Sequence, residues 1–91
     1  MSRVLDNLPP AQQAGILCGQ DPFRIFAASR LQIPGAVTAT AAAEFVRREC
    51  GVCSRAELDR DGDAAARWQA LRTEYDAWRG RIASPRERTQ P

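Results

Sequence analysis

The chain of 91 residues contains no histidine and no lysine, and the first absence limits its chemistry. Without histidine, the nucleophile–imidazole pairs of serine and cysteine hydrolases cannot form. A tetrahedral zinc site normally takes four ligands from cysteine and histidine, and the chain has only three cysteines. Glycine-rich phosphate loops are missing as well. We therefore expect a protein that is not an enzyme, that has no small-molecule substrate and that binds no metal or other cofactor.

Long hydrophobic runs are missing too. No segment is long enough to span a bilayer, and Pro9, Pro10 and Gly15 interrupt the first apolar stretch, which does not resemble a signal peptide. The expectation is a cytoplasmic protein that makes no contact with membranes. Thiols stay reduced in that compartment, so an odd number of cysteines predicts no disulfide framework.

Because lysine is absent, the 13 basic residues are all arginines, and with 11 acidic residues they leave a net charge of +2. The codon usage of a GC-rich genome is the main explanation for this bias. The alternative is selection for contacts with phosphates or planar bases, which guanidinium groups make better than ammonium groups. Since a strong overall basic field is absent, a nucleic-acid surface would have to be a local face.

What the chain has is a helical pattern, rich in alanine and poor in β-branched residues. Prolines at helix starts, caps and glycine stops predict four to five helices. The first helix begins at Pro9–Pro10 and ends near Gly19, and the second begins at the N-cap Asp21, has Pro22 as its first residue and ends at Pro34–Gly35. The third begins at Thr38 or Thr40 and ends at Cys50 before Gly51. A short helical turn then starts from a Ser54–Glu57 capping box, and the last helix runs from Asp63 to about Ile82. The first helix is expected to have one apolar side, formed by Ala11, Ala14, Ile16, Leu17 and Cys18.

The last helix shows the clearest periodicity. Its apolar residues recur at spacings of three and four, which predicts one continuous buried stripe of Trp68, Leu71, Tyr75, Trp78 and Ile82. Arg72 and Asp76 lie on the opposite, polar side at a distance that lets them pair. The predicted fold is an all-α, single-domain bundle over residues 1–83, followed by a flexible C-terminal tail over residues 84–91.

Two short patterns between the third and last helices suggest metal chemistry. Cys50 and Cys53 form a C-x-x-C pair, but Cys50 ends a helix, which raises a thiol pKa and disfavours redox chemistry. The run Asp59, Asp61, Asp63 lacks the glycine and the final glutamate of a calcium loop. We interpret Asp61 and Asp63 as caps at a helix start and Cys18 and Cys50 as small buried residues.

The same junction is the candidate binding site. Its five arginines surround the end of one helix and the start of the next, where free amides also favour anions; they are Arg47, Arg48, Arg55, Arg60 and Arg67. A solvated helix face is the plainer interpretation of these residues. The functional one is a surface that holds phosphates and stacks guanidinium groups on unpaired bases.

Two stretches, PPAQQAGILC and RRECGVCSRAELDRDGDAAARWQALRTEYDAW, resemble small accessory proteins from the early regions of temperate bacteriophages of GC-rich bacteria. The resemblance, which includes anti-CRISPR proteins, implies a binding role. The expected partner is then a host CRISPR effector complex or its single-stranded DNA. The alternative is a nucleic-acid-binding accessory of phage recombination or replication, and a third option is a dimerising module that uses part of the aromatic stripe.

Overall fold

The computed structural model describes the backbone of residues 5–83 and the side chains up to Gly80. Within this range the chain forms four α-helices, one short 3-10 helix and no strand. They are α2 (Pro10–Cys18), α3 (Asp21–Arg30), α4 (Ala39–Cys50), η1 (Arg55–Asp59) and α5 (Gly62–Ala83). The predicted all-α domain with a long C-terminal helix is confirmed. The predicted tail, residues 84–91, and the side chain of Ile82 lie outside the described residues.

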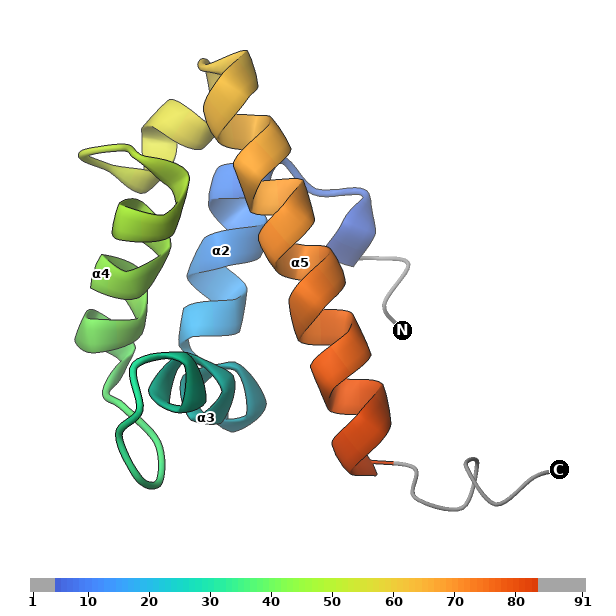
Figure 1. The fold of residues 1–91 in the computed structure, drawn as a ribbon. Helices are drawn as coiled ribbons and strands as arrows, with labels where there is room; N and C mark the ends of the chain where they lie inside the picture. The colour runs from blue at the N-terminus through green and yellow to red at the C-terminus, as the bar shows by residue number, and fades with distance from the viewer. Residues whose placement is uncertain (1–4, 84–91) are drawn as a thin grey trace, which may run out of the picture.

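Helices α2, α4 and α5 run alternately down and up the molecule (Figure 1). In Figure 1, α2 runs down to α3, α4 returns upward, η1 makes the turn at the top and α5 descends across the bundle. Helix α5 contacts α3, α4 and η1, while α2 contacts α3, α4 and η1. The start of α2, the end of α4, η1 and the start of α5 therefore meet at one end of the molecule. None of the described helices combines the length and apolar composition that crossing a membrane needs.

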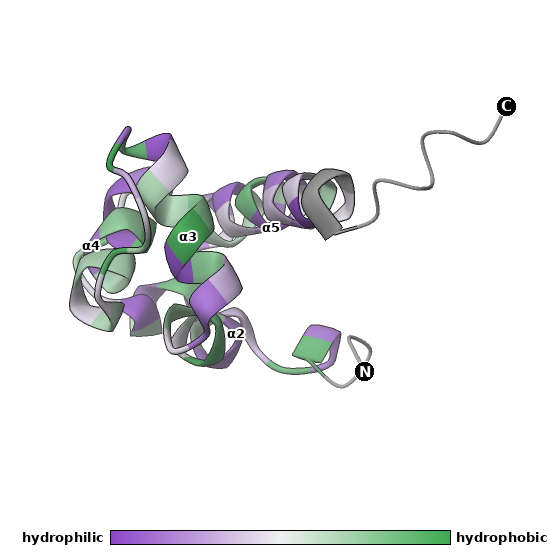
Figure 2. Cartoon of the chain, turned by 90° about the horizontal axis from the view of Figure 1, so that it is seen from below, coloured by the Kyte–Doolittle hydropathy of each residue, from purple (hydrophilic) through white to green (hydrophobic). Residues whose placement is uncertain are grey.

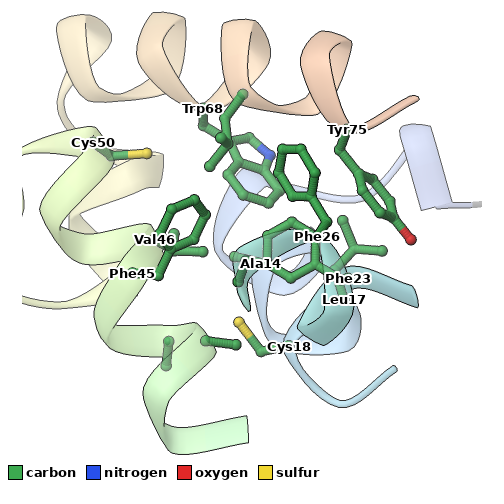
Figure 3. Close-up of a cluster of buried hydrophobic side chains, with 14 of the residues drawn as sticks. Ala14, Leu17, Cys18, Phe23, Phe26, Phe45, Val46, Cys50, Trp68 and Tyr75 are labelled. Carbon is green, nitrogen blue, oxygen red and sulfur yellow. The ribbon is translucent and has the colours of Figure 1, made fainter. Parts of the chain in front are cut away.

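The centre of the core is an aromatic cluster contributed by α3, α4 and α5, and α2 adds Ala14, Leu17 and Cys18 to it (Figure 3). Phe23 is fully buried and packs edge-on against Tyr75, with ring centroids 5.0 Å apart, while Phe26 meets Phe45 at 6.3 Å. Trp68 is fully buried as well. Such edge-to-face pairs add to the stabilisation from the buried area alone. The cluster therefore ties the last helix to the middle of the chain.

The predicted stripe of α5 is confirmed as far as the side chains are described. Trp68, Leu71 and Tyr75 are buried, and Trp78 is half-buried against Phe26 and Tyr75. Figure 2 shows hydrophobic and hydrophilic segments alternating along α5. One side of the helix therefore faces the core and the other faces solvent.

Several predicted boundaries are also confirmed. Thr38 is the N-cap of α4, and its hydroxyl oxygen accepts a hydrogen bond from the Ala41 amide at 3.1 Å. Gly51 ends α4 in the left-handed conformation with φ 71°, where a side chain would be strained. Asp61 Oδ1 accepts hydrogen bonds from the amides of Asp63 and Ala64 at the start of α5.

Three predictions about α2 and α3 are wrong. The N-cap of α3 is Gln20, whose backbone is extended, while Asp21 lies inside the helix and its carboxylate pairs with Arg24. Helix α3 stops at Arg30 rather than at Pro34, because Gln32 adopts φ 61° and the following amide bonds back to Ala28. Ile16, expected on the apolar side of α2, is 43% exposed.

Candidate nucleic-acid interface

The candidate site lies at the end of the molecule where α4 stops, η1 turns and α5 begins (Figure 1). Between residues 47 and 67 the sequence has five arginines and five carboxylates, so the formal charge of this segment is zero. The balance alone does not favour an anion. What matters is which of these charged groups are already engaged within the protein.

The carboxylates of the junction bind backbone amides. Asp59 Oδ1 accepts a hydrogen bond from the Ala11 amide at 3.0 Å, and Asp61 caps α5 as described above. Glu57 Oε1 accepts a hydrogen bond from the Cys53 amide at 3.3 Å. The predicted capping box is therefore wrong: Glu57 accepts from the Cys53 amide instead of the Ser54 amide, and the Ser54 side chain makes no cap. Three of the five carboxylates therefore serve as acceptors for the chain itself.

Two of the predicted arginines are engaged as well. Arg47 is half-buried and pairs with Glu44 of the preceding turn at 2.9 Å. Arg67 Nη1 donates a hydrogen bond to the Cys50 carbonyl oxygen at 3.1 Å, at the end of α4. A cation at a helix C-terminus binds the free carbonyl oxygens there and interacts favourably with the negative end of the helix dipole. Arg67 is therefore first of all a cap of α4.

The other three arginines have no carboxylate within ion-pair distance in the described part of the chain. Arg48 and Arg60 are exposed, and Arg55 is half-buried on α2. A Cβ at Gly15 would lie 3.9 Å from Cζ of Arg55, so a bare glycine backbone lies beneath this guanidinium group. The structure thus separates the five predicted residues into two that hold the fold and three whose donors face outward or lie along α2.

The prediction that Cys18 and Cys50 are small buried residues is confirmed. Cys18 and Cys50 are buried, and Cys53 is exposed. Burial raises the pKa of the Cys50 thiol to about 11, with Glu49 adding to the shift and Arg67 opposing it. Burial also raises the pKa of Cys18, against the opposing charges of Arg55 and Arg47. Among residues 5–80, no three side chains of the metal-binding types lie close enough to hold an ion.

Sequence reasoning missed a buried polar network that joins α2 to α5. Gln13 Oε1 accepts hydrogen bonds from Trp68 Nε1 at 2.9 Å and from Arg72 Nη1 at 3.0 Å. Arg72 Nη2 donates to Asp6 at 3.0 Å and, as predicted, lies beside Asp76 at 3.5 Å. The expectation that Arg72 lies on the solvent side is wrong, since this residue is only 7% exposed.

The missing signal was the hydrogen-bonding need of a buried tryptophan. An indole N–H placed in a core requires an acceptor, and Gln13 lies one residue before Ala14 on the inner side of α2. Gln13 Nε2 in turn donates to the Leu8 carbonyl oxygen at 2.8 Å, which docks residues 5–8 on the bundle. The network therefore has a structural role.

A small open pocket lies between α4 and α5 beside the junction. It has a volume of about 180 Å³ and is lined by Glu49, Arg67, Ala70, Leu71 and Glu74. Leu71 is buried and provides an apolar floor, while the charged residues surround it. Only Arg67 of this lining belongs to the predicted site.

Fold and site together define a small all-α domain with an arginine-bearing helix junction. No protein-family model, no curated protein and no solved structure matches this chain.

Proposed function

We propose that this chain is a phage-encoded, non-enzymatic binding protein of the anti-CRISPR type. It occupies a CRISPR surveillance complex or the single-stranded nucleic acid of that complex. The contact surface is the α4–η1–α5 junction with Arg48, Arg55 and Arg60 as its centre. Arg47 and Arg67 border this surface and contribute their remaining N–H donors.

One observation carries the proposal: three of the five carboxylates of the junction bind backbone amides, while three arginines have no acidic partner among the described residues. A guanidinium group that is not paired with a carboxylate keeps N–H donors for a phosphate. The amides that the carboxylates satisfy can no longer attract an anion, so the arginines supply the attraction. Single strands are the favoured form, because arginine stacks on exposed bases.

The test is a fluorescence-anisotropy titration with single- and double-stranded oligonucleotides at two salt concentrations. We expect tighter binding to single strands and a steep loss of affinity with salt, because bound phosphates release counterions. Arg48→Glu weakens binding, whereas Arg79→Glu is the matched control, since it makes the same charge change at an exposed site far along α5. Equal losses in both variants would show a non-specific charge effect and contradict the assigned surface.

A plaque assay on CRISPR-armed hosts, with and without this protein, tests the biological role. More plaques in its presence are the expected result. Strand binding without such rescue would instead favour an accessory of phage recombination or replication. Rescue without strand binding at low salt would leave a protein surface of the effector complex as the target.

A further inference from the structure

The pocket between α4 and α5 has three kinds of group around one small open cavity. Leu71 and Ala70 form an apolar floor, Arg67 provides N–H donors, and Glu49 and Glu74 provide carboxylate oxygens. The volume of about 180 Å³ is large enough for one planar ring system. Polar groups at fixed positions in a pocket orient its ligand.

The opposite charges in this pocket do not neutralise one another. Arg67 donates to the Cys50 carbonyl at 3.1 Å, and no ion pair joins it to Glu49 or Glu74. Glu74 is held by Arg30 of α3 at 2.8 Å. Glu49 is exposed and has no ion-pair partner in the described part of the chain. The cavity therefore presents one available carboxylate, the spare donors of one guanidinium group and an apolar floor.

We infer that this pocket binds one unpaired guanine base of the bound single strand, an inference that rests on the proposed function. Among the four DNA bases, only guanine has two adjacent N–H donors on its pairing edge, with a carbonyl acceptor beside them. A carboxylate accepts from two parallel donors at once, and Glu49 takes this role. The spare N–H groups of Arg67 donate to the guanine carbonyl, and the ring lies on Leu71 and Ala70. Reading an unpaired base by its pairing edge is typical of single-strand recognition.

The other bases fit this set of groups less well. Adenine and cytosine each offer one amino group next to a ring acceptor, which a carboxylate repels. Thymine places its single N–H between two carbonyl oxygens. Glu49 is therefore the specificity-determining residue, and Arg67 both caps α4 and contacts the base.

The experiment compares short oligothymidines that differ only in one central base, by fluorescence anisotropy at low salt. We expect the strand with one guanine to bind about tenfold more tightly than those with adenine, cytosine or thymine, as a bidentate base contact allows. Hypoxanthine in place of guanine lacks the exocyclic amino group and is expected to lose most of this preference. The ratio between strands is the readout, because it cancels the general attraction to phosphate.

Two variants connect the preference to the pocket. Glu49→Gln replaces one acceptor oxygen with a donor and is expected to abolish the preference for guanine, and Ala70→Leu fills the cavity at an exposed position with the same result. Glu44→Gln is the matched control: it removes the same charge from α4 outside the pocket and leaves the ratio unchanged. Equal binding of all four strands by the parent protein overturns the guanine inference and leaves the proposed function standing. No binding to any strand overturns the inference together with the nucleic-acid form of that function.

Discussion

Asp59 caps helix α2 from a distant part of the chain, because its Oδ1 accepts the hydrogen bond of the amide of Ala11, 48 residues earlier, at 3.0 Å. Helix α2 begins at Pro10, after the N-cap residue Pro9, and has no side-chain cap of its own. The amides of Gln12 and Gln13 bond the Pro9 carbonyl oxygen, so the Ala11 amide is the one in the first turn that depends on a residue of η1. This contact fixes η1 to the start of α2 and so sets the position of the whole arginine-bearing junction.

Asp59→Ala is expected to lower the free energy of unfolding by about 0.5–2 kcal/mol, the usual cost of removing a cap. Asp59→Asn keeps an oxygen acceptor in the same place and should lose clearly less. Urea denaturation of both variants measures the difference. Equal losses in the two variants would mean that the charge of Asp59, rather than its hydrogen bond, stabilises this contact.

Replacing Gln13 should be far more harmful than replacing its neighbour. Gln13→Leu leaves the N–H groups of Trp68 and Arg72 without their acceptor inside the protein. Each stranded buried donor costs about 1–3 kcal/mol. Gln12→Leu makes the same chemical change at an exposed position of the same helix and is the control. Thermal unfolding of the two variants would contradict the network's role if their midpoints were alike.

The two tryptophans of α5 should differ in their contribution to stability. Trp68 is fully buried and hydrogen-bonded, so Trp68→Ala is expected to cost about 3–5 kcal/mol or to prevent folding. Trp78 is half-buried at the edge of the cluster, so Trp78→Ala should cost less. Circular dichroism with urea denaturation measures both. A larger loss for Trp78 would show that the periphery of the aromatic cluster matters more than its centre.

Stability should fall in alkaline solution because a buried thiol resists ionisation. The pKa of Cys50 rises from 9.0 to about 11 in the folded protein. Below pH 9 the Cys50 thiol is neutral in both the folded and the unfolded state. Above pH 9 this thiol ionises in the unfolded chain but stays neutral in the folded protein, which favours unfolding. The loss grows between pH 9 and 11 and reaches about 2 kcal/mol near pH 10.5. Urea denaturation at neutral and alkaline pH measures this loss.

Cys50→Ala removes the ionising group and should reduce the difference between the two pH values. A part of the alkaline loss is expected to remain, since burial also raises the pKa values of Cys18 and Tyr75. An unchanged pH dependence in Cys50→Ala would contradict the assignment to this thiol.

The helices could be predicted from the sequence because their signals are local. The stripe of Trp68, Leu71 and Tyr75, the cap at Thr38 and the stop at Gly51 depend only on neighbours within one or two turns. The end of α3 could not be predicted in this way. It depends on the left-handed backbone conformation of Gln32, which residues other than glycine seldom adopt.

The site was harder to predict because its state depends on contacts between distant segments. The sequence places five arginines near one junction, but it does not reveal that Asp59 is bound to Ala11 or Arg67 to Cys50. It also assigns Arg72 to solvent, because helical periodicity cannot anticipate a buried partner such as Gln13 from another helix. Which charges remain open to a ligand is therefore a property of the tertiary structure.

The arginines of the junction should divide into structural and binding residues when they are replaced one at a time. Arg67→Gln removes the cation that caps α4 and is expected to lower the free energy of unfolding by about 0.3–1 kcal/mol, in the range of helix-dipole contacts. Arg48→Gln removes an exposed guanidinium group without such a contact and should leave stability unchanged within about 0.5 kcal/mol.

In the strand-binding titration, Arg48→Gln is expected to weaken binding and to reduce the slope of log affinity against log salt by about one, because one phosphate contact is lost. Urea denaturation and anisotropy on the same preparations measure both properties. If Arg48→Gln instead lowered stability and left the salt slope unchanged, Arg48 would belong to the fold and the binding surface would have to lie elsewhere.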